Sequence, residues 1–431
     1  MTDFFSQPGV WLLALFLVPL LFGIPISVAL GCATCFVLWK WNLGVMMLSY
    51  NFYAGIYKFP LLAIPFFILA GIIMEKAGIA ERIIRLINEL VGSMTGGLAI
   101  ATIAVATFWG AVSGSGPATV AALGLVLIPG MVKAGYDKAF ATSVVCVSSG
   151  LAIIIPPSII FIIYSDLMGT SIGALFAAGI LPGILVSFCL IVMVGLLSKA
   201  KNYKGTPRNT GTLKRAFLDA FWGLLTPVII LGGIYGGVFT PTEAAAVAVF
   251  YGLFIGFFVY RTLTLKTLGE VLVGALQGTS LIMFVVTCAN LYSWVGDTIG
   301  VIPKIGQAML GISQNPYVVL LSINAMLFVA GMLLDATAIM YVFMPILAPV
   351  VAYFKWDPIW FGVMVTINMA IGQVTPPVAV NLFVGANISG LRIEELTKPA
   401  IPQILAVIVA LAIVVLFPAL STFIPKAMGM Y

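Results

Sequence analysis

The sequence predicts an all-α polytopic membrane protein, and three observations support this prediction. Hydrophobic residues make up 62% of the 431 residues and charged residues only 8%, against about a quarter charged in soluble proteins. The mean hydropathy is +1.19. Long apolar runs fill most of the chain, and because one spanning helix needs about 20 apolar residues, we expect roughly a dozen passes or half-passes. The short alternating strands typical of a porin are not found in the sequence.

The N-terminus, "MTDFFSQPGVWLLALFLVPLL", has no basic segment and no small-residue cleavage site. It therefore indicates a retained first helix rather than a removed signal peptide. Because no organelle signal is present, we expect a multi-pass protein of the bacterial inner membrane.

The positive charge is concentrated in a linker, residues 199–219, whose segment "SKAKNYKGTPRNTGTLKR" carries no acidic residue. The positive-inside rule predicts that this linker is cytoplasmic. Short basic loops between membrane helices are common, so we expect no nucleic-acid partner.

The sequence is poorly supplied with catalytic residues. It contains no histidine, and its five cysteines lie in apolar runs. Cys32 and Cys35 match C-x-x-C but lie mid-helix without a second pair, so packing explains them. Because an intramembrane enzyme needs a nucleophile with a base, or a metal site, the sequence indicates a protein that is not an enzyme.

An internal repeat relates the two halves of the chain at a shift of 220 residues. Without a gap, the shift aligns the Pro-Pro pairs at 156–157 and 376–377, and it aligns Asp137 with Asp357. Transporters are often built from two such halves inserted with opposite topology, and their sites form where the corresponding broken helices meet. The repeat therefore predicts that the binding site forms at corresponding helix breaks of the two halves.

Four helix-breaking segments interrupt the apolar runs at corresponding places: "SGSGPAT" (113–119), "SSGLAIIIPPS" (148–158), "GMLLDATAIM" (331–340) and "NMAIGQVTPPVAVN" (368–381). Backbone groups freed by Pro or Gly persist in a membrane only where they are packed in protein or line a cavity. N-terminal ends of half-helices favour anions, whereas carbonyl ends and hydroxyls can bind a cation. The segments therefore predict a combined site for sodium and a carboxylate.

Simpler interpretations stay open. Small residues also let membrane helices pack closely. Asp335 fits a helix N-cap, although an ionisable residue inside a membrane run is usually functional, and the two roles can coexist. A passive channel would also use helix breaks and polar linings.

Two further stretches have architectural explanations. "TPTEAAAVAVF" from Thr240 predicts a helix start with a capping box, in which Glu243 reaches back. "EKAGIAERIIRLINELVGS" from Glu75 has apolar residues at helical spacing with charges opposite, which predicts a helix lying along the membrane interface.

A family resemblance follows from several motifs together. "GAVSGSGPATVAALG", "MVKAGYDKAFATSV", "IPPSIIFIIYS", "SIGALFAAGILPG", "PTEAAA" and "TPPVAVNLF" closely resemble the large membrane subunit of tripartite ATP-independent periplasmic (TRAP) transporters, the DctM-like family. The resemblance covers nearly the whole chain and is strongest to the sialic acid branch.

The resemblance implies a secondary transporter, in which a periplasmic binding protein delivers an organic acid and a sodium gradient drives uptake by an elevator movement. It implies an inverted repeat with two re-entrant hairpins, tips 113–119 and 331–340, in a transport domain beside a scaffold. In several relatives the small four-helix membrane subunit is fused ahead of the large one. Here a separate small subunit is expected as partner, besides the binding protein and membrane lipid. The expected solute is sialic acid (N-acetylneuraminate), with another organic acid such as a C4-dicarboxylate as the alternative, and Na+ is the expected coupling ion.

The expected organisation is residues 1–75 as N-terminal scaffold helices, 76–198 as the first transport segment, 199–219 as the linker, 220–296 as scaffold and connecting helices, 297–400 as the second transport segment and 401–431 as a C-terminal helix. The expected substrate-binding residues are Ser115, Ser158, Asp335, Thr337 and Asn368. One expected sodium site comprises Ser113, Ser115, Ser148, Ser149 and Gly150. The second comprises Gly331, Asp335, Thr337, Gly372 and Thr375.

Overall fold

The computed structural model describes residues 7–205 and 213–430, and all regular secondary structure in these residues is helical. Nine helices of this described part are long and apolar enough to cross a membrane. Shorter apolar helices of 10–17 residues lie before and between them in the chain. The all-helical, polytopic fold class predicted from composition is therefore confirmed.

The first half of the chain contains α2 (Pro8–Leu21), α3 (Ile26–Lys40), α4 (Met46–Ala54), the short turn η1 (Phe59–Leu62), α5 (Ala63–Lys76), α6 (Ile79–Val91), α7 (Gly97–Ser113), α8 (Gly116–Lys133), α9 (Lys138–Ser148), the 3-10 segment η2 (Ser149–Ile153), α10 (Ile159–Met168) and α11 (Ile172–Ala200). The second half contains α12 (Leu213–Tyr235), α13 (Pro241–Phe254), the π-turn η3 (Ile255–Val259), α14 (Leu265–Thr298), α15 (Val301–Ile312), α16 (Pro316–Leu333), α17 (Ala336–Tyr353), α18 (Pro358–Gly372), α19 (Val380–Ser389), α20 (Ile393–Leu416) and α21 (Ala419–Ala427).

The helix boundaries confirm the repeat. Moved by 220 positions, α8 coincides with α17 at both ends, and α7, α10 and α6 begin within two residues of α16, α19 and α15. The aligned residues Asp137 and Asp357 both act as N-caps, accepting hydrogen bonds from the backbone N–H of Phe140 at 2.8 Å and of Ile359 at 2.9 Å. Both Pro-Pro bonds are cis. Local signals, namely the aspartate N-caps and the Pro-Pro pairs, therefore set equivalent helix ends in the two halves.

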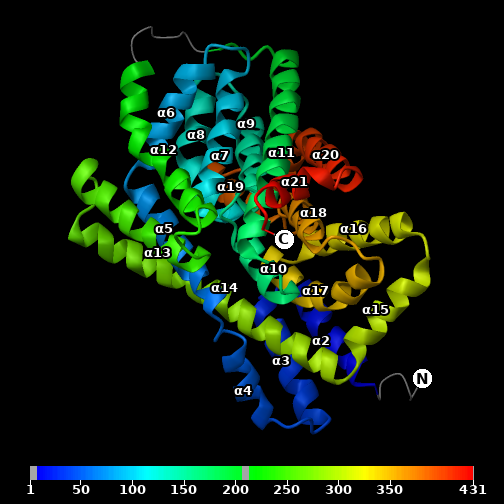
Figure 1. The fold of residues 1–431 in the computed structure, drawn as a ribbon. Helices are drawn as coiled ribbons and strands as arrows, with labels where there is room; N and C mark the ends of the chain where they lie inside the picture. Colours follow the sequence, from blue (N-terminus) through cyan, green and yellow to red (C-terminus); the bar gives the residue numbers. More distant parts are fainter. Residues whose placement is uncertain (1–6, 206–212, 431) are drawn as a thin grey trace.

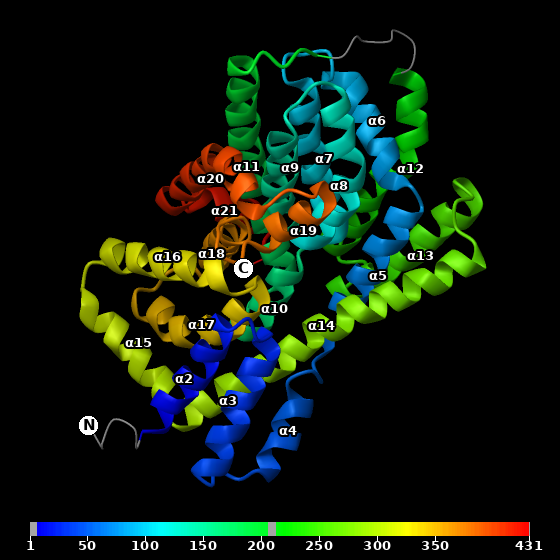
Figure 2. The same cartoon turned by 180° about the vertical axis from the view of Figure 1, so that it is seen from behind.

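The helices lie on either side of α14, which spans about 50 Å at 1.5 Å per residue and runs diagonally in Figure 1. It packs against α3, α5 and α17. Figures 1 and 2 show α2, α3 and α4 on one side of it and the bundle of α7, α8, α9 and α11 on the other. Helices from both halves of the chain thus meet along α14.

Several local expectations can be compared with the structure. The capping box at Thr240 is confirmed, because Glu243 Oε2 accepts a hydrogen bond from the Thr240 N–H at 2.8 Å. The stretch from Glu75 is not one helix: α5 ends at Lys76, and α6 begins after Gly78, whose φ is 72°. The expected C-terminal helix 401–431 contains most of α20 and all of α21, because the chain turns at Phe417. Within the linker 199–219, residues 206–212 lie outside the described residues.

Candidate functional site

The first hairpin tip is a tight turn between α7 and α8. α7 ends at Ser113, Gly114 has a φ of 64°, and Ser115 is extended. A Cβ on Gly114 would lie 3.0 Å from the carbonyl oxygen of Pro157, so a glycine at this position allows both the left-handed turn and the close approach. The tip therefore lies directly against the first Pro-Pro segment.

The second hairpin tip lies between α16 and α17 and carries the carboxylate. Asp335 Oδ2 accepts hydrogen bonds from the backbone N–H groups of Thr337 at 2.9 Å and Ala338 at 3.3 Å. The N-cap interpretation of Asp335 is therefore confirmed. Its negative charge is held at the start of α17, where the partial positive charge of the helix offsets it.

The second tip also contacts the second Pro-Pro segment. A Cβ on Gly331 would lie 3.0 Å from the Cα of Gly372, and one on Gly372 would lie 2.6 Å from the Cα of Gly331. The Val378 N–H donates to the carbonyl oxygen of Met332 at 3.0 Å. Both hairpin tips are thus packed, backbone against backbone, on a helix break.

The two broken segments each end one helix and start another. In the first, η2 follows α9, and the Ser158 hydroxyl donates to the carbonyl oxygen of Ile153 at 2.5 Å just before α10 begins. In the second, α18 ends at Gly372 and α19 begins at Val380. The Asn381 N–H donates to the carbonyl oxygen of Gln373 across this gap at 2.9 Å.

These segments enclose a cavity of about 440 Å³. Residues at the start of α8, α10, α17 and α19 line it, so the N-termini of the four helices that begin at the hairpin tips and helix breaks meet at one space. The starts of α3 and the middle of α14 close its other side. Asp335 is the one charged residue among the described residues that line it. Helix N-termini carry partial positive charge and unsatisfied N–H groups, so the cavity is suited to an anion.

The expected substrate-binding residues fall into two groups. Those that line the cavity are Ser115, Asp335 and Thr337. Ser158 and Asn368 are buried outside its described lining. The Ser158 hydroxyl is engaged in the cap of α10. The Asn368 amide donates to the carbonyl oxygen and to Oδ1 of Asn324, at 3.0 and 3.1 Å.

The residues expected to hold sodium near the first break are buried and close to helix carbonyls. The hydroxyls of Ser148 and Ser149 donate to the carbonyl oxygens of Val144 at 2.6 Å and Val145 at 2.7 Å. Each hydroxyl oxygen keeps its lone pairs for another partner. Ser113 lies on a separate cavity of about 160 Å³, and Ser115 lines both cavities.

The residues expected to hold the second sodium also surround a helix end. Gly331 and Gly372 bring two backbones together, as described above. The Thr375 hydroxyl donates to the carbonyl oxygen of Ile371 at 2.8 Å, in the last turn before the break. Gly150, from the first set, packs against α18, where its Cβ would lie 3.4 Å from the side chain of Ala370.

Sequence reasoning did not single out Gln373 and Asn381. Their amide oxygens are buried and have no hydrogen-bond partner among the described residues. A Cβ on Gly116 would lie 2.4 Å from Gln373 Oε1 and 2.9 Å from Asn381 Oδ1, so both amides lie at the start of α8. A buried acceptor without a partner costs about 1–3 kcal/mol. The signal in the sequence was a side-chain amide on each side of the helix break, in segments that are otherwise apolar.

Comparison with known proteins gives a consistent family assignment. The family model "Tripartite ATP-independent periplasmic transporter, DctM component" matches residues 13–420. The C4-dicarboxylate TRAP transporter large permease protein DctM of Pseudomonas aeruginosa is 40% identical, over 86% of this chain and 87% of its own length. The sialic acid TRAP transporter large permease protein SiaM of Vibrio cholerae is 36% identical, over 94% and 95%.

Some relatives are longer than this chain. The isethionate TRAP transporter permease protein DctMQ of Oleidesulfovibrio alaskensis is 40% identical over 95% of this chain, which spans 65% of that relative's length. Among solved structures, the Alcanivorax borkumensis YdaH transporter aligns with a TM-score of 0.59 at 16% identity, covering 88% of each chain. This last likeness concerns the fold alone.

Proposed function

Because the chain belongs to the DctM component family of tripartite ATP-independent periplasmic transporters, we propose that it is the large membrane subunit of a sodium-coupled importer of an organic acid. It is a multi-pass protein of the bacterial inner membrane and not an enzyme. Its proposed partners are a separate small membrane subunit and a periplasmic binding protein that delivers the solute.

The observation that carries the proposal is the convergence of four helix N-termini on one cavity. The starts of α8, α10, α17 and α19 all line the space of about 440 Å³. Each contributes partial positive charge without a mobile counter-charge, which suits a carboxylate. Asp335 is tied to the start of α17, so its charge opposes the anion less than that of an uncapped carboxylate would. Ser115 and Thr337 provide hydroxyls at the same tips.

The proposed solute is sialic acid, a carboxylated sugar. The cavity volume lies in the range of small-molecule pockets, about 300–1,000 Å³, and its lining offers hydroxyls and an amide besides apolar surface. Relatives at about 40% identity are named for a C4-dicarboxylate and for isethionate, so a smaller organic acid is the rival solute. Uptake measured with a panel of these acids decides between them.

Sodium is the proposed coupling ion, with one site at Ser113, Ser115 and residues 148–150 and another at the second tip and break. Hard oxygen ligands suit such a cation. The hydroxyl lone pairs of Ser148 and Ser149 and the carbonyls at both breaks would supply them. Binding of sodium between a tip and a break would hold the two together, which links ion binding to the shape of the cavity.

The proposed movement is an elevator displacement of the two transport segments, 76–198 and 297–400, along a scaffold formed by 1–75 and 220–296. The two segments would be inserted as an inverted repeat. The boundary passes along α14, which packs against helices of both proposed groups. Cross-links that join α14 to α17 should then block uptake, whereas cross-links between α14 and α3 should be tolerated.

The proposed function is tested by uptake in proteoliposomes that contain this chain, a small membrane subunit and a cognate binding protein. We expect accumulation of the acid only under an inward sodium gradient. Equal uptake without sodium would refute the coupling. Single-channel currents carried by the acid would refute the carrier mechanism in favour of a passive pore.

A further inference from the structure

A separate, polar cavity lies where α6, α12 and the end of η3 meet, away from the proposed transport site. Its volume is about 350 Å³. The residues that line it are Glu81, Arg82, Arg85, Asp219, Val259 and Tyr260. Two guanidinium groups and two carboxylates therefore face one space, so the cavity offers both signs of charge with no net excess of either.

Contacts in this cavity fix some of these groups and leave others able to bind. The Arg82 guanidinium carbon lies 3.7 Å from the ring centroid of Tyr260, and Arg82 Nη1 donates to the carbonyl oxygen of Gly78 at 2.6 Å. The Tyr260 hydroxyl donates to the carbonyl oxygen of Asp219 at 2.6 Å. Arg85 Nη1 and Asp219 Oδ2 are 3.8 Å apart, which is longer than a hydrogen bond. Both groups can therefore hydrogen-bond to a third molecule.

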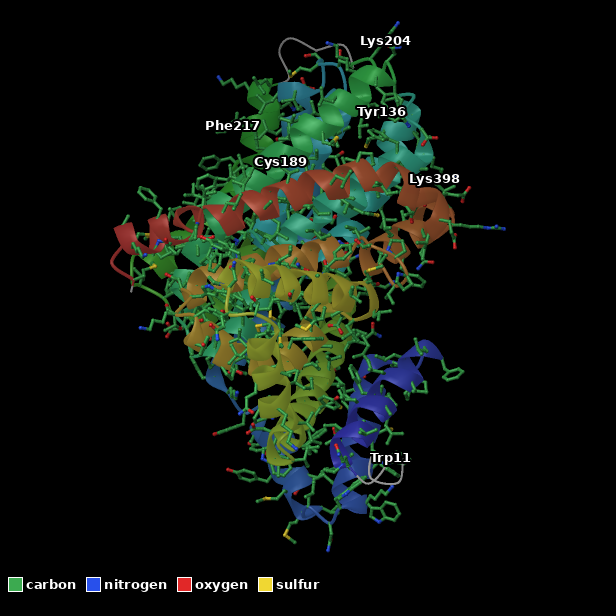
Figure 3. The ribbon with its side chains drawn as sticks, turned by 90° about the vertical axis from the view of Figure 1, so that its right-hand side faces the viewer. Trp11, Tyr136, Cys189, Lys204, Phe217 and Lys398 are labelled. Carbon is green, nitrogen blue, oxygen red and sulfur yellow. The ribbon has the colours of Figure 1, made fainter. Side chains whose placement is uncertain are left out.

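The cavity lies where spanning helices begin and end. Asp219 is in the second turn of the span Leu213–Tyr235, and Tyr260 directly follows the span Pro241–Val259. Trp222 and Phe258, on the same two helical segments, are 37% and 70% exposed. In Figure 3, Phe217 of α12 and Lys204 of the basic linker lie toward one end of the molecule, and Trp11 lies toward the other. Charged groups next to exposed aromatic side chains at a span boundary are typical of the lipid headgroup level.

The equivalent helix of the repeat shows whether the helix needs these charges. A shift of 220 residues places Glu81, Arg82 and Arg85 of α6 on Val301, Ile302 and Ile305 of α15. The helix is kept in both halves, but its charged face is present only in the first. The helical structure of this segment therefore does not depend on these three charges.

We propose that this cavity binds the headgroup of phosphatidylethanolamine from the surrounding bilayer. The phosphodiester would accept hydrogen bonds from Arg82 and Arg85, since arginine donors match phosphate geometry. The primary ammonium would donate to the carboxylates of Glu81 and Asp219. Phosphatidylcholine lacks ammonium N–H donors and phosphatidylglycerol lacks the cation, so both would leave carboxylates without a partner. The bound lipid would hold α6 against α12, next to the first hairpin.

The test is the lipid retained by the full chain, purified in mild detergent from membranes that contain both phosphatidylethanolamine and phosphatidylglycerol, and counted by mass spectrometry. We expect phosphatidylethanolamine to be enriched over its bulk fraction. Arg85→Ala should reduce its retention about tenfold, the effect of losing one charge-assisted contact. Lys266→Ala is the matched control, because Lys266 is an exposed cation at the start of α14, and it should leave retention unchanged.

Asp219→Asn gives a readout that a general loss of stability would not produce. Removing one carboxylate leaves the cavity with a net positive charge, so the preference should move from phosphatidylethanolamine toward phosphatidylglycerol. Bulk lipid proportions in the wild-type chain, or equal losses in the Arg85 and Lys266 variants, would overturn the proposal. Displacement of the lipid by millimolar O-phosphoethanolamine would show that a soluble headgroup suffices and would overturn the lipid assignment.

Discussion

The ion pair between Lys58 and Asp166 joins the two proposed groups of helices, and its removal should have unequal effects from the two sides. Lys58 Nζ lies 2.8 Å from Asp166 Oδ2. Lys58 directly precedes η1, and Asp166 is near the end of α10. The side chain of Lys58 is 36% exposed and that of Asp166 only 8%. Since residues at the start of α10 line the cavity of about 440 Å³, the pair holds the far end of a helix that borders the proposed transport site.

The exposures set the expected magnitudes. Lys58→Met leaves a nearly buried carboxylate without its cation, which approaches the buried-pair case of about 3–5 kcal/mol; partial exposure of the site reduces the expected cost to about 2–3 kcal/mol. Asp166→Asn leaves an ammonium that can rotate into water, and its expected cost is about 1 kcal/mol. The double variant should lose less than the sum of the two, because neither remaining group is an unpaired charge.

The measurement is the free energy of unfolding by SDS titration in mixed micelles, for the wild type, both single variants and the double variant. Lys398→Met serves as control, because Lys398 (labelled in Figure 3) is an exposed lysine of α20, and its removal should change the free energy little. Equal costs for the two single variants, or a coupling energy near zero, would show that the pair is solvated like a surface salt bridge and would refute the reasoning.

Three further predictions concern the proposed transport site. Gly372→Ala places a Cβ 2.6 Å from the Cα of Gly331, so we expect a loss of about 1–3 kcal/mol in stability and a loss of uptake. Gly311→Ala is the control, because a Cβ on Gly311 would have no described heavy atom within 4 Å. It should change neither thermal unfolding nor uptake. Asp335→Asn keeps the N-cap but removes the charge. Asp335→Ala removes both, and it should lower stability by about a further 1 kcal/mol. Wild-type uptake by either variant would exclude the carboxylate from transport. Gln373→Leu removes a buried amide oxygen that lacks a described partner. Stability should therefore be kept or raised, while the apparent affinity for the acid or for sodium falls. An unchanged affinity for both would contradict a binding role for this amide.

Helix boundaries in this protein could be predicted from the sequence because the signals are local. Gly114, the Pro-Pro pairs and the aspartate caps act on the backbone within one turn, so the breaks at 113–119 and 331–340 fall where the sequence predicts them. The four helix N-termini could be predicted one by one for the same reason. That they line a single cavity depends on how α8, α10, α17 and α19 pack, and no local signal carries this information. Ser158 shows the limit, because it is the N-cap of α10, whose first residues line the cavity, while Ser158 itself is buried outside the described lining.

The repeat itself shows why packing partners are harder to predict than helix ends. The equivalent helices α6 and α15 lie next to α12 and α2, and α2 moved by 220 residues overlaps only the last part of α12. α6 packs on α12, and the two helices border the charged cavity of about 350 Å³, whereas residues of α2 and α15 line a different cavity of about 570 Å³. The residues that differ are on the faces of these helices, where Arg85 of α6 corresponds to Ile305 of α15. Different side chains on the equivalent helices α6 and α15 thus give each half of the molecule a surface that the other half lacks.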